Sequence, residues 1–281
     1  MPELPEVETT RKGILPYIEE QTIIDIIIRQ PKLRWLIPPE IHKAEGAIIK
    51  SVKRRGKYIL LEAELDQKTI GTVIIHLGMS GSLRVIDAGL TPEKHDHIDI
   101  AFDNGKAIRL RDPRRFGAVL WTTSNPLKHK LLRSLGPEPL SQKHIEHQEF
   151  NAEYLYQQSR NRSVSIKQFI MNAHIVVGVG NIYACESLFK AGISPKRLAG
   201  KTSKKRYKKL VEMIKEVLSQ AIEQGGTTLR DFVQAEGNPG YFQQKLFVYG
   251  REKQPCLHCD KDIKQIKQGQ RSTFYCSNCQ H

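Results

Sequence analysis

Two Cys-x-x-Cys pairs near the end of the chain restrict its C-terminal fold more than any other feature. Cys256 and Cys259 form the first pair, and Cys276 and Cys279 form the second after a spacer of sixteen residues. Four thiolates at this spacing can complete a tetrahedral zinc site, whereas two disulfides or two redox pairs are the alternatives. We see no secretion signal at the N-terminus and expect a reducing compartment, which favours one structural zinc ion. So small a segment depends on its metal for stability.

The spacer between the two pairs predicts a β-hairpin. The letters IKQIKQ precede Gly269, RSTFY follows, and Arg271 lies just past the expected tip. A rigid hairpin with several lysines suits a DNA groove, and a protein partner is the alternative. The remaining cysteine, Cys185, is expected to be a small buried residue without chemistry of its own.

The charge of the chain points toward a polyanionic partner. There are 44 Lys+Arg against 30 Asp+Glu, which gives a formal net charge of +14. Nucleic acid is the partner this suggests, and a generally basic protein is the alternative. The longest apolar stretches, such as IIDIII, have the length of strands rather than of membrane spans. We therefore expect a cytoplasmic protein that has no membrane partner.

Residues 1–123 predict an N-terminal β-sandwich domain that begins with one helix. The apolar residues between Glu6 and Ile18 form a helical stripe behind Pro5, a good first-turn residue. Short β-branched segments follow up to about residue 121, and they include the hairpin HIDIAFD, Asn104-Gly105, KAIRLR. Several short strands behind one helix indicate a sandwich or a barrel.

The second half of the chain predicts helices, so the fold class is α+β. Residues 124–140 are rich in proline and are expected to form the linker, residues 141–245 a helical domain, and residues 246–281 the zinc element. The expected helices are 150–159, 164–172, 181–190 and 203–224. The last has a lysine-rich face, which is either a solvated surface or a DNA contact. The glycine-rich residues 225–242 are expected to form a mobile loop.

Two short motifs have both a functional and a purely structural interpretation. RDPRRFG at 111–117 could be a wedge that unstacks bases, or one packed aromatic among salt-bridged arginines. Met79, between glycines in HLGMSG, could protrude in the same way. VVGVGN before a helix could expose backbone N–H groups to a phosphate, or it could be a tight turn capped by Asn181.

Nine motifs, in order from the first residue to the last, resemble bacterial formamidopyrimidine-DNA glycosylase. They are PELPEVET at the start, RRGKY at 54–58, HLGMSGSLR at 76–84, KHDH at 94–97, DPRRFG at 112–117, VVGVGNIYA at 176–184, QGGTTLRDF at 224–232, PGYF at 239–242 and the four-cysteine tail. The resemblance implies a β-sandwich, a helix-two-turn-helix domain with a lesion-recognition loop, and a zinc finger. It also implies a monomer that acts on double-stranded DNA containing oxidised purines and is associated with the nucleoid.

The resemblance further implies four catalytic residues. Removal of the initiator methionine exposes the amine of Pro2, which attacks C1′ of the damaged nucleotide, expels the base and forms a Schiff base. The pKa of an α-amino group is about 8, so a useful fraction of the amine is neutral at cellular pH. Glu3 passes a proton to the sugar ring oxygen, and Lys57 donates a proton in β-elimination. Arg271 grips phosphates and assists the second elimination.

The DNA-contacting residues implied by the resemblance are spread over the whole chain. They are His95, Arg114 and Arg162 at DNA contacts, Lys167 and Asn181 at a phosphate clamp, and Met79, Arg114 and Phe116 in the space left by the extruded base. Base extrusion is required because C1′ cannot be reached inside the stack. Arg111 and Asn172 depart from the family pattern, which has a small hydroxyl residue and an acid at these positions.

Two rival interpretations remain open at this stage. The sister enzyme endonuclease VIII removes oxidised pyrimidines with the same terminal proline. Leu4, the residues Met79, Arg114 and Phe116, and the long loop at 225–242 favour the purine-specific enzyme. A zinc-containing DNA-binding protein without catalysis is the second rival, and it has no special need for the proline and glutamate at the chain start.

Overall fold

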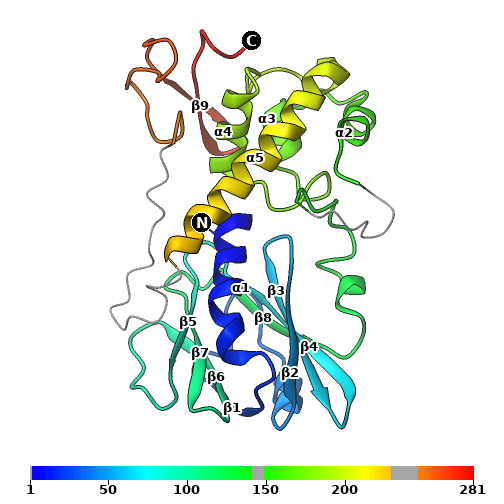
Figure 1. Cartoon of the computed structure of the whole chain (residues 1–281), viewed down its shortest axis with the longest axis vertical. Coiled ribbons are helices and arrows are strands. Elements are labelled where there is room, and N and C mark those ends of the chain that lie inside the picture. The colour runs from blue at the N-terminus through cyan, green and yellow to red at the C-terminus, as the bar shows by residue number, and fades with distance from the viewer. Residues whose placement is uncertain (1, 141–148, 229–245) are drawn as a thin grey trace. The chain divides into compact units, whose positions relative to one another are not determined.

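The computed structural model describes residues 2–140, 149–228 and 246–281 (Figure 1). The chain divides into two compact units. The first is built mainly from residues up to Arg133, and the second mainly from Ser134 to Glu223 together with the C-terminal element. Within the described ranges, no helix has both the length and the apolar character that crossing a bilayer demands.

The first unit is a β-sandwich with one helix, as the sequence predicted. Helix α1 spans Leu4–Ile18 and packs against β2, β3 and β5. One antiparallel sheet has the order β1-β6-β7-β5, and the other has the order β2-β3-β4-β8 (Figure 1). The strands are β1 (Ile23–Ile28), β2 (Ile48–Arg55), β3 (Tyr58–Leu65), β4 (Lys68–His76), β5 (Ser82–Asp87), β6 (Asp96–Phe102), β7 (Lys106–Arg111) and β8 (Ala118–Thr122).

The core of this unit lies between the two sheets and under α1. Val7, Ile14 and Ile18 from the predicted helical stripe are buried in the same cluster as the inward side chains of both sheets. The predicted hairpin is confirmed, since β6 and β7 pair antiparallel across Asn104-Gly105. Gly105 has φ +77°, which L-residues with side chains rarely adopt and which this tight turn requires. Two short 3₁₀ helices, η1 (Pro39–Ala44) and η2 (Pro126–Lys128), complete the unit.

The second unit contains the predicted helices around one apolar cluster. They are α2 (Ala152–Ser159), α3 (Ile166–Ile170), α4 (Asn181–Lys190), the 3₁₀ helix η3 (Ala199–Lys201) and α5 (Lys204–Thr228). One boundary was wrong, because α5 continues through residues 225–228, which the glycine pair had suggested were loop. Burial of the apolar face stabilises the long helix more than the two glycines destabilise it, since each glycine costs only about 1 kcal/mol. The rest of the predicted loop lies outside the described residues.

The C-terminal element is the predicted hairpin. Strand β9 (Lys264–Gln268) pairs antiparallel with β10 (Arg271–Tyr275), so Arg271 begins the second strand directly after the turn. The carboxylate of Glu186 in α4 accepts three backbone N–H bonds, from residues 247, 248 and 249, at 2.8–3.0 Å. Cys185 is buried beside it, as expected. The element is therefore anchored to α4 by hydrogen bonds and by apolar packing.

Candidate functional site

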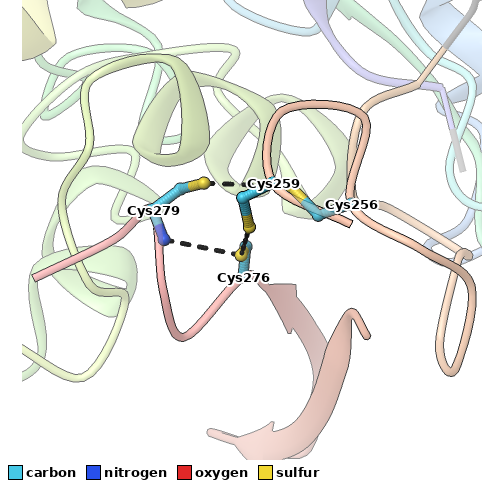
Figure 2. A group of neighbouring side chains, drawn as sticks. All are labelled: Cys256, Cys259, Cys276 and Cys279. Carbon is cyan, nitrogen blue, oxygen red and sulfur yellow. Dashed lines mark hydrogen bonds between the residues drawn. The ribbon is translucent and has the colours of Figure 1, made fainter. Parts of the chain in front are cut away.

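The four cysteines of the C-terminal element converge on one point (Figure 2). Their sulfur atoms all lie within 4.8 Å of one another, with Cys256 Sγ 3.9 Å from Cys279 Sγ and Cys259 Sγ 3.5 Å from Cys276 Sγ. Tetrahedral zinc with Zn–S bonds of about 2.3 Å needs sulfur separations of roughly 3.8 Å. The backbone N–H of Cys279 points at Cys276 Sγ at 3.4 Å, a contact that favours thiolate. The geometry therefore fits one structural zinc.

Lys167 joins this finger to the helical unit. Its side chain is only 1% exposed, and Nζ donates to Asn181 Oδ1 at 2.6 Å, Thr273 Oγ1 at 2.6 Å and the Ser272 carbonyl at 3.1 Å. The structure thus brings the two predicted clamp residues into direct contact. Because the ammonium group donates to these protein oxygens, Lys167 holds Asn181 and the finger in a fixed orientation.

Asn181 has a different local role from the one the tight-turn alternative assumed. The N-cap of α4 is Gly180, and Asn181 is the first residue of the helix. Its amide nitrogen donates to the Ser272 carbonyl at 2.9 Å, next to Arg271 in β10. Arg162 lies apart on the surface, where its Nε donates to the Gln158 carbonyl. Two of the three predicted DNA contacts of this unit, Lys167 and Asn181, therefore meet at one junction, next to the strand that begins with Arg271.

The chain start of the first unit is held by reciprocal capping of α1. The backbone N–H of Glu3 donates to Glu6 Oε2 at 2.8 Å, and the Glu3 side chain accepts from the backbone N–H of Glu6. Glu3 is 2% exposed, and Pro2 is half-buried just outside the helix. This arrangement places the backbone nitrogen of Pro2 at the positive end of the helix dipole. Met1 lies outside the described residues.

An ion-pair triad fixes α1 against the strand that leads to Lys57. Glu8 accepts from Arg11 Nη2 at 2.7 Å and from Arg54 Nε at 2.8 Å, and Arg54 also donates to the carbonyl of Gly56 at 2.9 Å. Burial raises the pKa of Glu8, but the two arginines outweigh it and hold the pKa below its ordinary value. The carboxylate is therefore ionised at neutral pH, and it ties the first turns of α1 to the β2–β3 turn.

Three predicted wedge residues protrude from two loops of the first unit. Met79 is 40% exposed and Phe116 is 42% exposed, and Arg114 Cζ lies 4.9 Å from the centroid of the Phe116 ring. The loops pack backbone to backbone at Gly78, where φ is +66° and a Cβ would lie 2.3 Å from the backbone carbon of Phe116. The alternative of a buried aromatic is wrong, because the ring faces solvent.

Asp112 connects these loops to a fourth predicted residue, His95. Its buried carboxylate accepts the hydroxyl of Ser80 at 2.7 Å and the N–H of Gly117 at 2.7 Å. Its own backbone N–H donates to the carbonyl of His95 at 3.0 Å. Ser80 Oγ in turn accepts the N–H of Arg114 at 3.2 Å. One buried charge therefore sets the positions of the loops that carry Met79, Arg114, Phe116 and His95.

Replacing Ser80 with alanine should lower the free energy of unfolding by about 1 kcal/mol, because one hydrogen bond of the buried carboxylate is lost. Urea denaturation measures this loss. Ser82→Ala, at the start of β5, is the matched control and should change the stability less. Equal stability of the two variants would show that the Ser80–Asp112 bond does not hold the loops.

The family comparison covers almost the whole chain. Residues 1–119 match the formamidopyrimidine-DNA glycosylase N-terminal domain, residues 135–233 match the formamidopyrimidine-DNA glycosylase H2TH domain, and residues 253–281 match the zinc finger found in FPG and IleRS. The formamidopyrimidine-DNA glycosylase of Idiomarina loihiensis is 56% identical over 280 residues, with both chains covered completely. The chain belongs to the formamidopyrimidine-DNA glycosylase family.

Further relatives and solved structures agree with this assignment. The formamidopyrimidine-DNA glycosylase of Photobacterium profundum is 53% identical over the full length of both chains. The MutM (Fpg) protein of Thermus thermophilus is 35% identical with a TM-score of 0.83, covering 99% of this chain and 98% of its own. A Lactococcus lactis FPG mutant solved with a Fapy-dG containing DNA is 31% identical with a TM-score of 0.86, and 99% of each chain is covered.

Two residues of the candidate site were not predicted from the sequence. Asp112 belongs to the arginine motif, but the motif gives no sign that its carboxylate joins the two loops. His76 is the first residue of HLGMSG. Burial, then Lys57 and Arg34, lower its pKa to about 4, so the ring is neutral at pH 7. Its Nδ1 accepts the N–H of Gly78 at 2.9 Å, which leaves the proton on Nε2. The sequence signal for this role is a histidine two residues before a glycine that can form a turn.

Proposed function

We propose that the chain is a DNA glycosylase and AP lyase that removes oxidised purines, such as 8-oxoguanine and formamidopyrimidines, from double-stranded DNA. A bond forms between the Pro2 nitrogen and C1′ while the glycosidic bond breaks, and the electron pair of that bond leaves with the base, which takes up the proton that the Pro2 nitrogen gives up. Glu3 protonates the ring oxygen, so that the sugar opens and a Schiff base remains. β-elimination then breaks the bond to the 3′ phosphate, and δ-elimination breaks the bond to the 5′ phosphate.

The observation that carries this proposal is the buried carboxylate of Glu3 directly after Pro2. Glu3 is 2% exposed, and its side chain accepts the backbone N–H of Glu6, so packing and capping hold the carboxyl group next to Pro2. The helix dipole favours the neutral form of the amine, which is the nucleophilic form. A DNA-binding module without chemistry could use Glu3 to cap α1, but it has no need for a terminal proline amine beside that carboxyl group. Removal of Met1 is a necessary step, because an acylated nitrogen cannot attack C1′.

The remaining site residues support contact with a distorted DNA strand. Met79, Arg114 and Phe116 protrude together, as a wedge that fills the space of an extruded base must. Lys57 lies in the β2–β3 turn that the Glu8–Arg54 ion pair anchors, and it is proposed to act near the scissile phosphates. His95, Arg162, Asn181 and Arg271 are proposed to bind phosphates. Lys167 is proposed to complete the clamp by holding Asn181 against the finger.

The zinc finger has a structural part in the proposed function. Zinc bound by Cys256, Cys259, Cys276 and Cys279 would hold the β9–β10 hairpin in one shape. The hairpin presents Arg271, which is proposed to neutralise phosphate charge while strand cleavage proceeds. Double-stranded DNA with its dense negative charge also suits the net charge of +14.

Borohydride trapping tests the proposal directly. The protein is incubated with an 8-oxoguanine duplex, and separately with an oxidised-pyrimidine duplex, in the presence of reductant. We expect a covalent adduct that maps to Pro2, with the purine duplex trapped faster. Faster trapping with the pyrimidine duplex would favour the endonuclease VIII activity. Tight DNA binding without any adduct would favour the non-catalytic module, and an adduct on a lysine would refute the Pro2 mechanism.

A further inference from the structure

The loop of residues 31–37 in the first unit exposes apolar and cationic side chains on a rigid frame. Leu33 and Ile37 are each 5% exposed and belong to the core between the sheets. The N–H of Ile37 donates to the Pro31 carbonyl at 2.9 Å, and the N–H of Leu33 donates to the Trp35 carbonyl at 3.1 Å. The loop is thus closed on itself and anchored at both ends.

The side chains that this frame turns outward are unusual for a solvated loop. Leu36 is 66% exposed and Trp35 is 37% exposed, side by side in sequence. Arg34 is also exposed, and its Cζ lies 4.7 Å from the centroid of the Trp35 ring. Exposed large apolar groups on a fixed loop mark an interaction surface more often than a solvated one. An arginine stacked on an indole can bind a nucleic acid, because the guanidinium pairs with a phosphate and the indole covers a flat or apolar group.

The loop is joined to the wedge by a backbone hydrogen bond. The N–H of Arg34 donates to the carbonyl of Gly117 at 3.0 Å, directly after Phe116. The positive charge of Arg34 also reaches Tyr58 and His76, where it opposes the burial-driven rise of the Tyr58 pKa and helps to lower the His76 pKa. Arg34, Lys57 and His76 are therefore neighbours in one electrostatic cluster beside the wedge.

We infer that Arg34 and Trp35 form a further DNA contact, in which the guanidinium binds a backbone phosphate and the indole covers the adjacent deoxyribose. This inference rests on the proposed function, because it takes the wedge to be inserted into DNA. A DNA strand that contacts Phe116 would next pass Gly117. The carbonyl of Gly117 accepts the N–H of Arg34, so the same strand would reach the loop of residues 31–37. The positive charge of the cluster selects the sugar–phosphate backbone over an uncharged protein surface as the occupant.

Equilibrium binding tests this contact with the full-length zinc-loaded protein and a duplex that contains a tetrahydrofuran abasic analogue. Arg34→Gln should weaken binding by about tenfold and should reduce the slope of log K against log [salt] by about 0.9, the value for one phosphate. Trp35→Ala should weaken binding by about fivefold or more. Lys68→Gln is the matched control, because it makes the same charge change at the other end of the strand that ends at His76, roughly 26 Å away.

Fluorescence gives a second measurement, since the chain has only two tryptophans, Trp35 and Trp121. DNA binding should shift the emission of the wild type, and Trp35→Phe should remove that shift. If Arg34→Gln had the same affinity and the same salt slope as Lys68→Gln, the inference would be overturned. A wild type that binds DNA but never excises a base would instead refute the proposed function, while the Arg34 contact would still be measured.

Discussion

Replacing Glu3 with glutamine should slow base release strongly and should leave binding to lesion-containing DNA intact. The amide has the size of the carboxylic acid and keeps an oxygen that can accept the N–H of Glu6, so the capping of α1 survives. The backbone bond from Glu3 N–H to Glu6 Oε2 is untouched. What the substitution removes is the proposed ability to give a proton to the sugar ring oxygen. General acid catalysis contributes about 10²- to 10⁴-fold, and we expect a loss within this range.

Single-turnover kinetics on an 8-oxoguanine duplex measure this loss, and fluorescence anisotropy on the same duplex measures the affinity. Glu19→Gln provides the matched control, because it makes the same charge change at the exposed C-terminal end of α1. The control should excise at the wild-type rate. Wild-type excision by Glu3→Gln would assign the proton transfer to another group and would remove the main support for the mechanism.

Loss of zinc has the second largest expected effect. Cys276→Ser should lower the zinc content to near zero and weaken DNA binding by at least about 100-fold. Structural zinc sites contribute roughly 10–16 kcal/mol of apparent binding free energy at pH 7, far more than this short hairpin can replace. Cys276 follows β10 directly, so the strand that carries Arg271 and Thr273 loses its fixed end. Lys167 and Asn181 then lose their bonds to Ser272 and Thr273 as well.

Cys185→Ala is the matched control for this experiment, since it also removes one buried thiol but lies in α4 outside the four-sulfur group. It should keep one zinc per chain and near wild-type DNA affinity. Zinc is measured by atomic absorption and affinity by anisotropy on the abasic-analogue duplex. Stoichiometric zinc together with tight DNA binding in Cys276→Ser would show that the finger neither needs this thiolate nor supports the contact.

Local chemistry was enough to predict most elements of this fold. Strand periodicity, the Asn104-Gly105 turn and the spacing of the cysteine pairs each act within about twenty residues, and the structure confirms all three. The helical stripe behind Pro5 likewise became α1. The glycine pair at 225–226 predicted the end of the helix too early. The helix propensity lost at two glycines is smaller than the stabilisation that a long amphipathic helix gains by packing.

The amino-acid sequence by itself determined the elements of this protein, its zinc ligands and its charge. Only the tertiary structure decided which residues meet. Ser80 and Asp112 are 32 positions apart, and Lys167 and Thr273 are 106 positions apart, yet each pair shares a short hydrogen bond. Such bonds form because a buried charge must find partners wherever the packed core places them, and no local pattern encodes that choice. This is why the wedge loops and the Lys167 junction became visible only in the folded chain.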